Sequence, residues 1–152
     1  MSRAAPAHAD LAQWLLAHEI VGATDAPALA DATERVFEKL SDRLSRLVSA
    51  AGSRALVSRS LYLARAEFPF LEGVRAGTTA ERCFEGLTER IQDVETSEAG
   101  KGLLAVLVAL LHLLIGFIGE DLTVRLVREV WPDIPLFVTS RPGNADGQEA
   151  IS

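Results

Sequence analysis

The chain has almost no cysteine, because Cys83 is the only one among its 152 residues. A single cysteine cannot form an intramolecular disulfide bond, so the sequence favours a protein of a reducing compartment. The N-terminal segment reaches His8 and Asp10 before any apolar run begins, and it shows no signal-peptide pattern. We therefore expect a cytoplasmic protein.

The chain also lacks an excess of positive charge. It has 15 basic and 21 acidic side chains, for a net charge of −6, and this balance disfavours nucleic acid as the main partner. The charge is uneven, because residues 43–66 carry five arginines and no acid, whereas residues 67–98 carry eight acids and three arginines. Tyr62 is the only aromatic residue among the arginines of the first segment. We expect the two segments to complement each other in the fold, rather than a basic docking face.

Patterns typical of metal sites and of catalysis are missing. The three histidines, His8, His18 and His112, do not have the spacing of metal ligands, and Cys83 has no cysteine partner. No serine stands in the context of a nucleophile elbow. The sequence therefore predicts no metal, no cofactor and no enzyme activity.

One short motif resembles part of an enzyme family. Trp131-Pro132-Asp133 is similar to the acid loop of tyrosine phosphatases, which also need a cysteine followed by an arginine six positions later. The sixth residue after Cys83 is Glu89. We therefore interpret the motif as a helix that ends at a proline, with Trp131 as an anchor.

The longest apolar run, Leu103–Ile118, dominates the rest of the chain. Its sixteen residues would form a helix about 24 Å long, which is short of the roughly 30 Å core of a bilayer. No cluster of Lys or Arg flanks it to set an orientation. We expect a core helix of a water-soluble bundle that is buried on most sides. A membrane-inserting protein that uses residues 103–118 is an alternative.

The remaining pattern is helical and gives the fold class. Residues 98–131 predict one long helix or two abutting helices, and no segment requires a sheet. Four further helices are expected: Asp10 to Gly22, Asp25 to Gly52, Ser53 to Pro69, and Thr78 with Glu81 as a capping box to Val94. The predicted fold is an all-α, single-domain bundle of five or six helices around residues 98–131. Residues 1–138 form this domain, and the polar segment 139–152 is expected to be a disordered tail.

His112 is the only strongly polar side chain within the apolar run. A histidine inside an apolar helix must find a hydrogen-bond partner or bind a ligand. We expect a satisfied core histidine. The alternative is a ligand sensor that binds haem, a lipid or another apolar molecule near His112.

A polar network is expected at the end of the run. Glu120 follows the apolar residues directly, so its carboxylate should be partly buried and need a cation. Arg59 and Arg65 lie on a predicted helix that also looks buried, and Arg125 lies one helical turn beyond Glu120. We expect Glu120 to pair with Arg59 or Arg65; the alternative is ordinary pairing of Arg125 with its helix neighbours.

Two segments carry a resemblance to other proteins. Residues 54–69 (RALVSRSLYLARAEFP) and 117–132 (FIGEDLTVRLVREVWP) resemble segments of small helical bacterial proteins for which we know no activity, cofactor or partner. The resemblance implies a bacterial origin and assigns no functional residue. Strong helical patterning without a catalytic pattern favours a protein–protein interaction module, regulatory or adaptor-like, that binds a protein partner or its own copies.

Overall fold

The computed structural model describes residues 6–20, 25–79 and 82–134. It is 75% helical, so the all-α prediction of five or six helices is confirmed. The elements in chain order are α1 (Pro6–Glu19), α2 (Ala26–Leu44), α3 (Ala50–Arg65), a 3-10 turn η1 (Pro69–Leu71), β1 (Arg75–Thr79), β2 (Arg82–Glu85), α4 (Leu87–Ile91), α5 (Thr96–Ile118) and α6 (Glu120–Val130).

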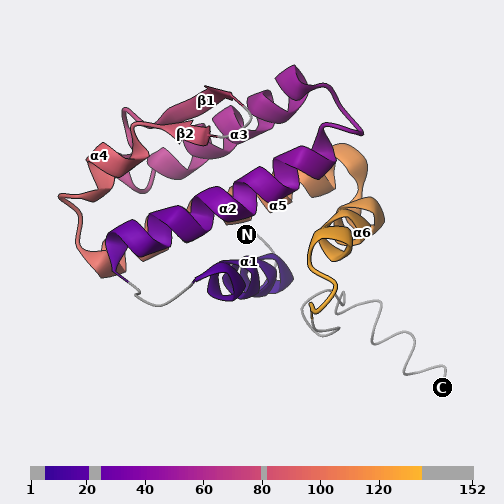
Figure 1. Cartoon of the computed structure of the whole chain (residues 1–152), viewed down its shortest axis with the longest axis horizontal. Helices are drawn as coiled ribbons and strands as arrows, with labels where there is room; N and C mark the ends of the chain where they lie inside the picture. Colours follow the sequence, from indigo (N-terminus) through magenta and orange to yellow (C-terminus); the bar gives the residue numbers. More distant parts are fainter. Residues whose placement is uncertain (1–5, 21–24, 80–81, 135–152) are drawn as a thin grey trace.

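Helix α5, which contains the apolar run, is the centre of the fold. It packs against α1, α2, α3 and α6. Figure 1 shows α2 running along the front of α5, with α3 on one side and α1 on the other. The buried side chains of α5 recur at helical spacing and form its inward side: Leu103, Val106, Leu107, Leu110, Leu111 and Leu114.

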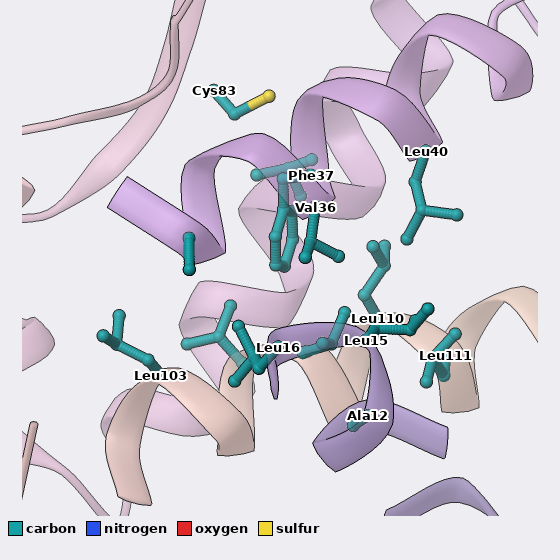
Figure 2. Close-up of a cluster of buried hydrophobic side chains, with 14 of the residues drawn as sticks. Ala12, Leu15, Leu16, Val36, Phe37, Leu40, Cys83, Leu103, Leu110 and Leu111 are labelled. Carbon is teal, nitrogen blue, oxygen red and sulfur yellow. The ribbon is translucent and has the colours of Figure 1, made fainter. Parts of the chain in front are cut away.

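The core lies between α5 and the helices that cover it. Figure 2 shows side chains of α1, α2 and α5 gathered in one apolar cluster around Phe37 of α2. The ring of Phe37 meets the ring of Phe84 edge-on, with 4.8 Å between the ring centroids. This contact attaches the β-hairpin to α2, because aromatic rings bury a large area and favour this geometry.

A glycine separates α5 from α6. Gly119 has a φ of 91°, which lies in the left-handed region that residues with a Cβ rarely adopt, and the helix ends there. Residues 98–131 therefore form two abutting helices, which is the second of the two arrangements predicted. The turn lets α6 pack against α2 as well as α5.

The helix boundaries agree with the sequence in part. Asp25 caps α2 as expected, and its carboxylate accepts a hydrogen bond of 3.1 Å from the amide of Ala28. The predicted cap of α3 at Ser53 is wrong, because Ser49 caps the helix and Gly52 lies in its first turn. Helix α1 begins at Pro6, upstream of the expected cap at Asp10.

The prediction of a helix from Thr78 to Val94 is wrong. Its first half is a β-hairpin, in which Arg75 pairs with Glu85 and Ala76 with Phe84. Gly86 follows with a φ of 88°, so a continuous helix cannot pass through it, and only the short α4 remains helical. The apolar spacing of Cys83, Phe84, Leu87 and Ile91 suggested a helix, and all four side chains are indeed buried.

The predicted disordered tail, residues 139–152, lies outside the described residues, as does the domain boundary at residue 138.

Candidate functional site

The side of α5 turned away from its inward side is less buried than the inward side. We call it the outer face, and it consists of eight residues that are partly or fully exposed: Lys101, Leu104, Ala105, Val108, Ala109, His112, Ile115 and Gly116. Their spacing of three and four residues places them along one stripe of the helix. Apart from Lys101 and His112, the stripe is apolar.

The C-terminal end of α5 carries a further exposed apolar side chain, which is not part of the outer face. Phe117 is 61% exposed, the most of the exposed large apolar side chains in the described residues. A Cβ added at Gly116 would meet no atom within 4 Å, so the space beside this glycine is open. The prediction that the run is buried on most sides is therefore only partly right. The inward side is core, and the apolar side chains of the outer face are partly exposed.

The length and apolarity of α5 also meet the criteria for crossing a membrane. Only 39% of its most apolar stretch is buried in the bundle. The core helix of a water-soluble protein meets the same criteria, and α5 makes extensive contacts with α1, α2 and α3. The feature that needs an explanation is thus the partly exposed apolar side of a helix whose other side is the core.

Charged residues stand at both ends of the outer face. Lys101 is exposed in the second turn of α5. Glu120 and Asp121 open α6 directly after Gly119 and line a shallow hollow of about 380 Å³ together with Arg125. The outer face therefore has one basic end and one acidic end.

His112 lies at the middle of the outer face and is exposed. The expectation of a satisfied core histidine is wrong about burial, because the side chain is exposed, although the residue does have an interaction partner. The hollows described in this section are not lined by His112. The proposed role of His112 as a ligand of haem or another apolar molecule stays a prediction.

The expected polar network is divided between two places. Arg59 and Arg65 both lie over the ring of Tyr62, with 5.5 and 5.2 Å from the guanidinium carbon to the ring centroid. Glu120 and Arg125 border the same hollow at the start of α6. Among the ion pairs of the described residues, none joins Glu120 to Arg59 or Arg65.

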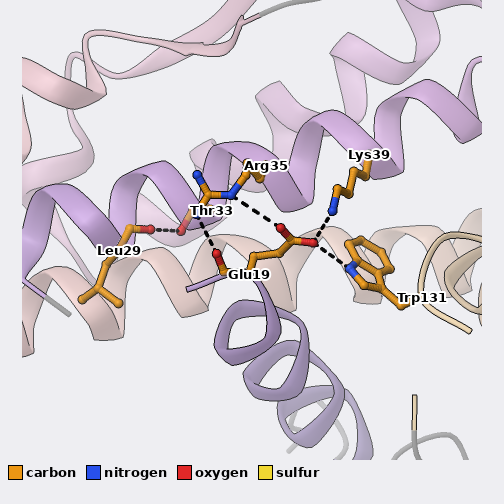
Figure 3. Close-up of polar contacts among 6 residues, drawn as sticks. All are labelled: Glu19, Leu29, Thr33, Arg35, Lys39 and Trp131. Atoms are coloured by element: carbon orange, nitrogen blue, oxygen red, sulfur yellow. Dashed lines mark hydrogen bonds and ion pairs between the residues drawn. The ribbon is translucent and has the colours of Figure 1, made fainter. Parts of the chain in front are cut away.

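A second polar cluster, which sequence reasoning missed, surrounds Glu19 at the end of α1. Figure 3 shows Arg35 and Lys39 of α2 and Trp131 after α6 converging on its carboxylate. The indole Nε1 of Trp131 donates a hydrogen bond of 2.9 Å to Oε2, and Lys39 Nζ pairs with the same oxygen. Arg35 lies 3.5 Å from Oε1 through Nε and donates to the backbone carbonyl of Glu19 through Nη2 at 2.6 Å.

This cluster has a structural role, because it joins α1, α2 and the residue after α6. We call Glu19, Arg35, Lys39 and Trp131 the clasp. Glu19 is 6% exposed. Burial by itself raises its pKa, but hydrogen bonds from Lys39 and Trp131 and the charges of Lys39 and Arg35 outweigh burial and lower the pKa. A carboxylate held ionised by three donor groups has no free proton to transfer. Trp131 is 2% exposed, which confirms its interpretation as an anchor.

The single cysteine borders a hollow between α2, α3 and the hairpin. This hollow has a volume of about 310 Å³ and is also lined by Ser41, Ser53 and Arg54. Burial raises the pKa of the Cys83 thiol to about 11, with the charges of Glu34 and Glu38 acting in the same direction. The thiol is therefore protonated at neutral pH and a poor nucleophile.

Comparisons with known proteins add nothing to this picture. No protein-family model, no curated protein and no solved structure matches the chain. No group of three or more His, Cys, Asp or Glu side chains that could hold a metal ion occurs in the part of the chain that the structure describes.

Proposed function

We propose that this protein is a small helical protein–protein interaction module, adaptor-like, that binds through the outer face of α5. The observation that carries the proposal is the partly exposed apolar side of the central helix, from Leu104 to Gly116. Contiguous apolar surface of this kind is rare on water-soluble proteins and marks sites of association. An apolar helix stripe with residues at i, i+4 and i+8 is also a common means of helix–helix recognition.

The charges near the outer face favour a protein over a lipid surface. Helices that lie on anionic membranes carry Lys and Arg along their polar side. Here Lys101 is the only basic residue on the outer face, and the acidic pair Glu120 and Asp121 stands at the other end. Insertion of α5 would also detach it from α1, α2 and α3, which bury their apolar residues against it.

The ligand-sensor alternative has less support. A cofactor pocket is expected to be concave and to enclose most of its ligand. The side chain of His112 is instead exposed, and His112 lines none of the hollows described above. The cytoplasmic location and the bacterial origin suggested by the sequence stay predictions.

The experiment that tests the proposal places a charge on the outer face without disturbing the fold. Gly116→Glu suits this purpose, because the position is exposed, its surroundings are open and glutamate is a better helix former than glycine. The matched control is Leu47→Glu, at an exposed apolar side chain outside α5. Tagged full-length protein carrying each substitution would be purified from its native cells, and bound proteins, including untagged copies of the chain, identified by mass spectrometry.

We expect the wild type and Leu47→Glu to retain the same bound protein and Gly116→Glu to lose it. Circular dichroism should show equal helix content in all three. Equal binding by the wild type and Gly116→Glu would contradict the proposal.

A further inference from the structure

The hollow between α2, α3 and the hairpin contains a buried hydroxyl that has no hydrogen bond. Ser53 is 4% exposed and lines this hollow, whose volume is about 310 Å³. The other buried hydroxyls of the described residues each donate to the carbonyl oxygen four residues earlier: Thr33, Ser60 and Thr123. The Ser53 hydroxyl makes no such bond within the described residues. Buried polar groups are nearly always hydrogen-bonded, so this exception indicates a partner that is not part of the chain.

The α3 side of the hollow favours a negative charge. It is formed by the first turn of α3, where Ala50 and Ala51 line the hollow together with Arg54. The first amides of a helix have no carbonyl partner within it, and the hydroxyl of Ser49 accepts only from the amide of Gly52. Among the ion pairs of the described residues, none includes Arg54. Amides at a helix N-terminus and a guanidinium group are the donors that typically hold a carboxylate.

The α2 side of the hollow favours a positive charge. Glu38 and Asp42 lie one helical turn apart on α2, and both line the hollow. In the part of the chain that the structure describes, neither carboxylate takes part in an ion pair. Like charges at this spacing repel each other, and a cation between them would remove the repulsion. An ammonium group has three donors, which suits two carboxylates and the hydroxyl of Ser41, another residue that lines the hollow.

The two sides together match a small molecule that carries both charges. We infer that the hollow binds a free α-amino acid, whose ammonium group meets Glu38 and Asp42 and whose carboxylate meets Arg54 and the first turn of α3. The carboxylate also provides the acceptor that the hydroxyl of Ser53 lacks. A volume of about 310 Å³ lies at the lower end of the range for small-molecule sites, as an amino acid requires. The outer face of α5 does not line this hollow, so the inference does not depend on the proposed function.

Thermal unfolding of the full chain with each of the common L-amino acids tests the inference. At about 5 mM, an amino acid whose dissociation constant is about a tenth of that concentration should raise the melting temperature by about 3–6 °C. We expect at least one of them to do so. Its amide, which lacks the carboxylate, and its N-acetyl derivative, which lacks the ammonium group, are the matched controls and should cause no shift. The absence of a shift with every amino acid, or an equal shift with either derivative, would overturn the inference.

Ser53→Ala separates a hydroxyl that binds a ligand from one that supports the fold. Without ligand, the melting temperature should equal or exceed that of the wild type, because the hydroxyl makes no hydrogen bond and alanine favours the helix. The affinity for the amino acid, measured by calorimetry, should fall roughly tenfold, because a hydrogen bond to a charged group is lost. Ser58→Ala, at an exposed serine of α3 that does not line this hollow, is the control and should bind like the wild type. Unchanged affinity in Ser53→Ala would contradict the assigned role of the hydroxyl.

Neutral substitutions test the two charged sides of the hollow. Asp42→Asn removes a charge from the ammonium side, and Arg54→Gln removes one from the carboxylate side; both residues are exposed, so the helix content should not change. Each variant should bind the amino acid at least tenfold more weakly, because one charge-assisted contact is lost. Arg46→Gln, at an exposed arginine that does not line the hollow, is the control and should keep the wild-type affinity. Wild-type affinity in either Asp42→Asn or Arg54→Gln would place the binding elsewhere and overturn the inference.

Discussion

Trp131 and Glu19 join the segment after α6 to the end of α1: the indole nitrogen donates to the carboxylate at 2.9 Å across 112 residues of sequence. The contact is buried, and it links the residue after α6 to the last residue of α1. Lys39 and Arg35 supply the positive charge that balances the acid. The clasp therefore connects three helices through one carboxylate.

Removing the charge of this carboxylate should destabilise the fold. In Glu19→Gln the amide can keep one hydrogen bond, but the charge-assisted bonds to Lys39 and Arg35 are lost. We expect a loss of about 2 kcal/mol in the free energy of unfolding, measured with urea. Both cations are partly exposed and can be hydrated, so a loss of 5 kcal/mol is not expected. Glu98→Gln, at an exposed glutamate in the first turn of α5, is the control and should change stability by less than about 0.5 kcal/mol.

The same carboxylate should give the stability a dependence on acid pH. Its folded-state pKa is lowered from the ordinary value of 4.5, so the unfolded state binds the proton more readily. The stabilisation is complete above pH 4.5 and is lost as the pH falls through the lower, folded-state pKa. The difference in melting temperature between wild type and Glu19→Gln should thus shrink in that acid range. A difference that stays constant between pH 7 and pH 3 would show that Glu19 does not titrate in this way.

Two glycines of α5 should respond in opposite ways to the same substitution. Gly116→Ala should stabilise the monomer by about 0.5–1 kcal/mol, because alanine favours the helix and the site is open. At Gly102 the new Cβ would lie 2.5 Å from the ring of Phe70, so the ring must move and part of its packing is lost. In thermal unfolding at low protein concentration, the melting temperature of Gly116→Ala should be higher than that of the wild type. The melting temperature of Gly102→Ala should be lower than that of Gly116→Ala. Equal melting temperatures for the two variants would show that Phe70 adapts without cost.

Both the backbone angle and the surroundings of Gly86 disfavour any other residue at this position. Its φ of 88° disfavours any residue with a Cβ, and that Cβ would lie 2.8 Å from the carbonyl oxygen of Gly73. We expect Gly86→Ala to lower the free energy of unfolding by about 1–3 kcal/mol. Gly100→Ala, where the nearest atom is Leu29 Cδ1 at 3.5 Å, is the matched helical control. A fully stable Gly86→Ala protein would mean that the hairpin ends differently.

The thiol of Cys83 should resist modification while the protein is folded. It is buried, and its pKa of about 11 leaves very little thiolate at neutral pH. Incubation with iodoacetamide at pH 7.5 should leave the mass unchanged for hours, whereas addition of urea should allow alkylation within minutes. Rapid alkylation of the folded protein would show that the hollow beside α2 and α3 opens readily.

The sequence predicted the parts of the fold that depend on local pattern. The cap at Asp25 and the apolar helix around Leu107 follow from residue type and spacing, and both are present. The hairpin escaped prediction because Phe84, Leu87 and Ile91 fit a helical period equally well. The sequence does not show that Gly86 takes a positive φ, which excludes a continuous helix through this position.

The candidate site was harder to foresee for a different reason. A run that is apolar on every side does not reveal which side its neighbours cover, so His112 was expected in the core. The clasp at Glu19 depends on contacts between residues as far apart as Glu19 and Trp131. A pair of residues so far apart produces no periodic pattern in a single sequence.

The position of α5 in the chain has a consequence for synthesis. A ribosome makes α1, α2 and α3 before α5, yet these three helices bury their apolar sides against it. Until residue 118 has left the ribosome, they have no complete surface to pack on, and their leucines stay exposed to water and to chaperones. The growing chain is therefore most prone to aggregation just before its most apolar segment appears, and α5 then completes the folding of everything made before it.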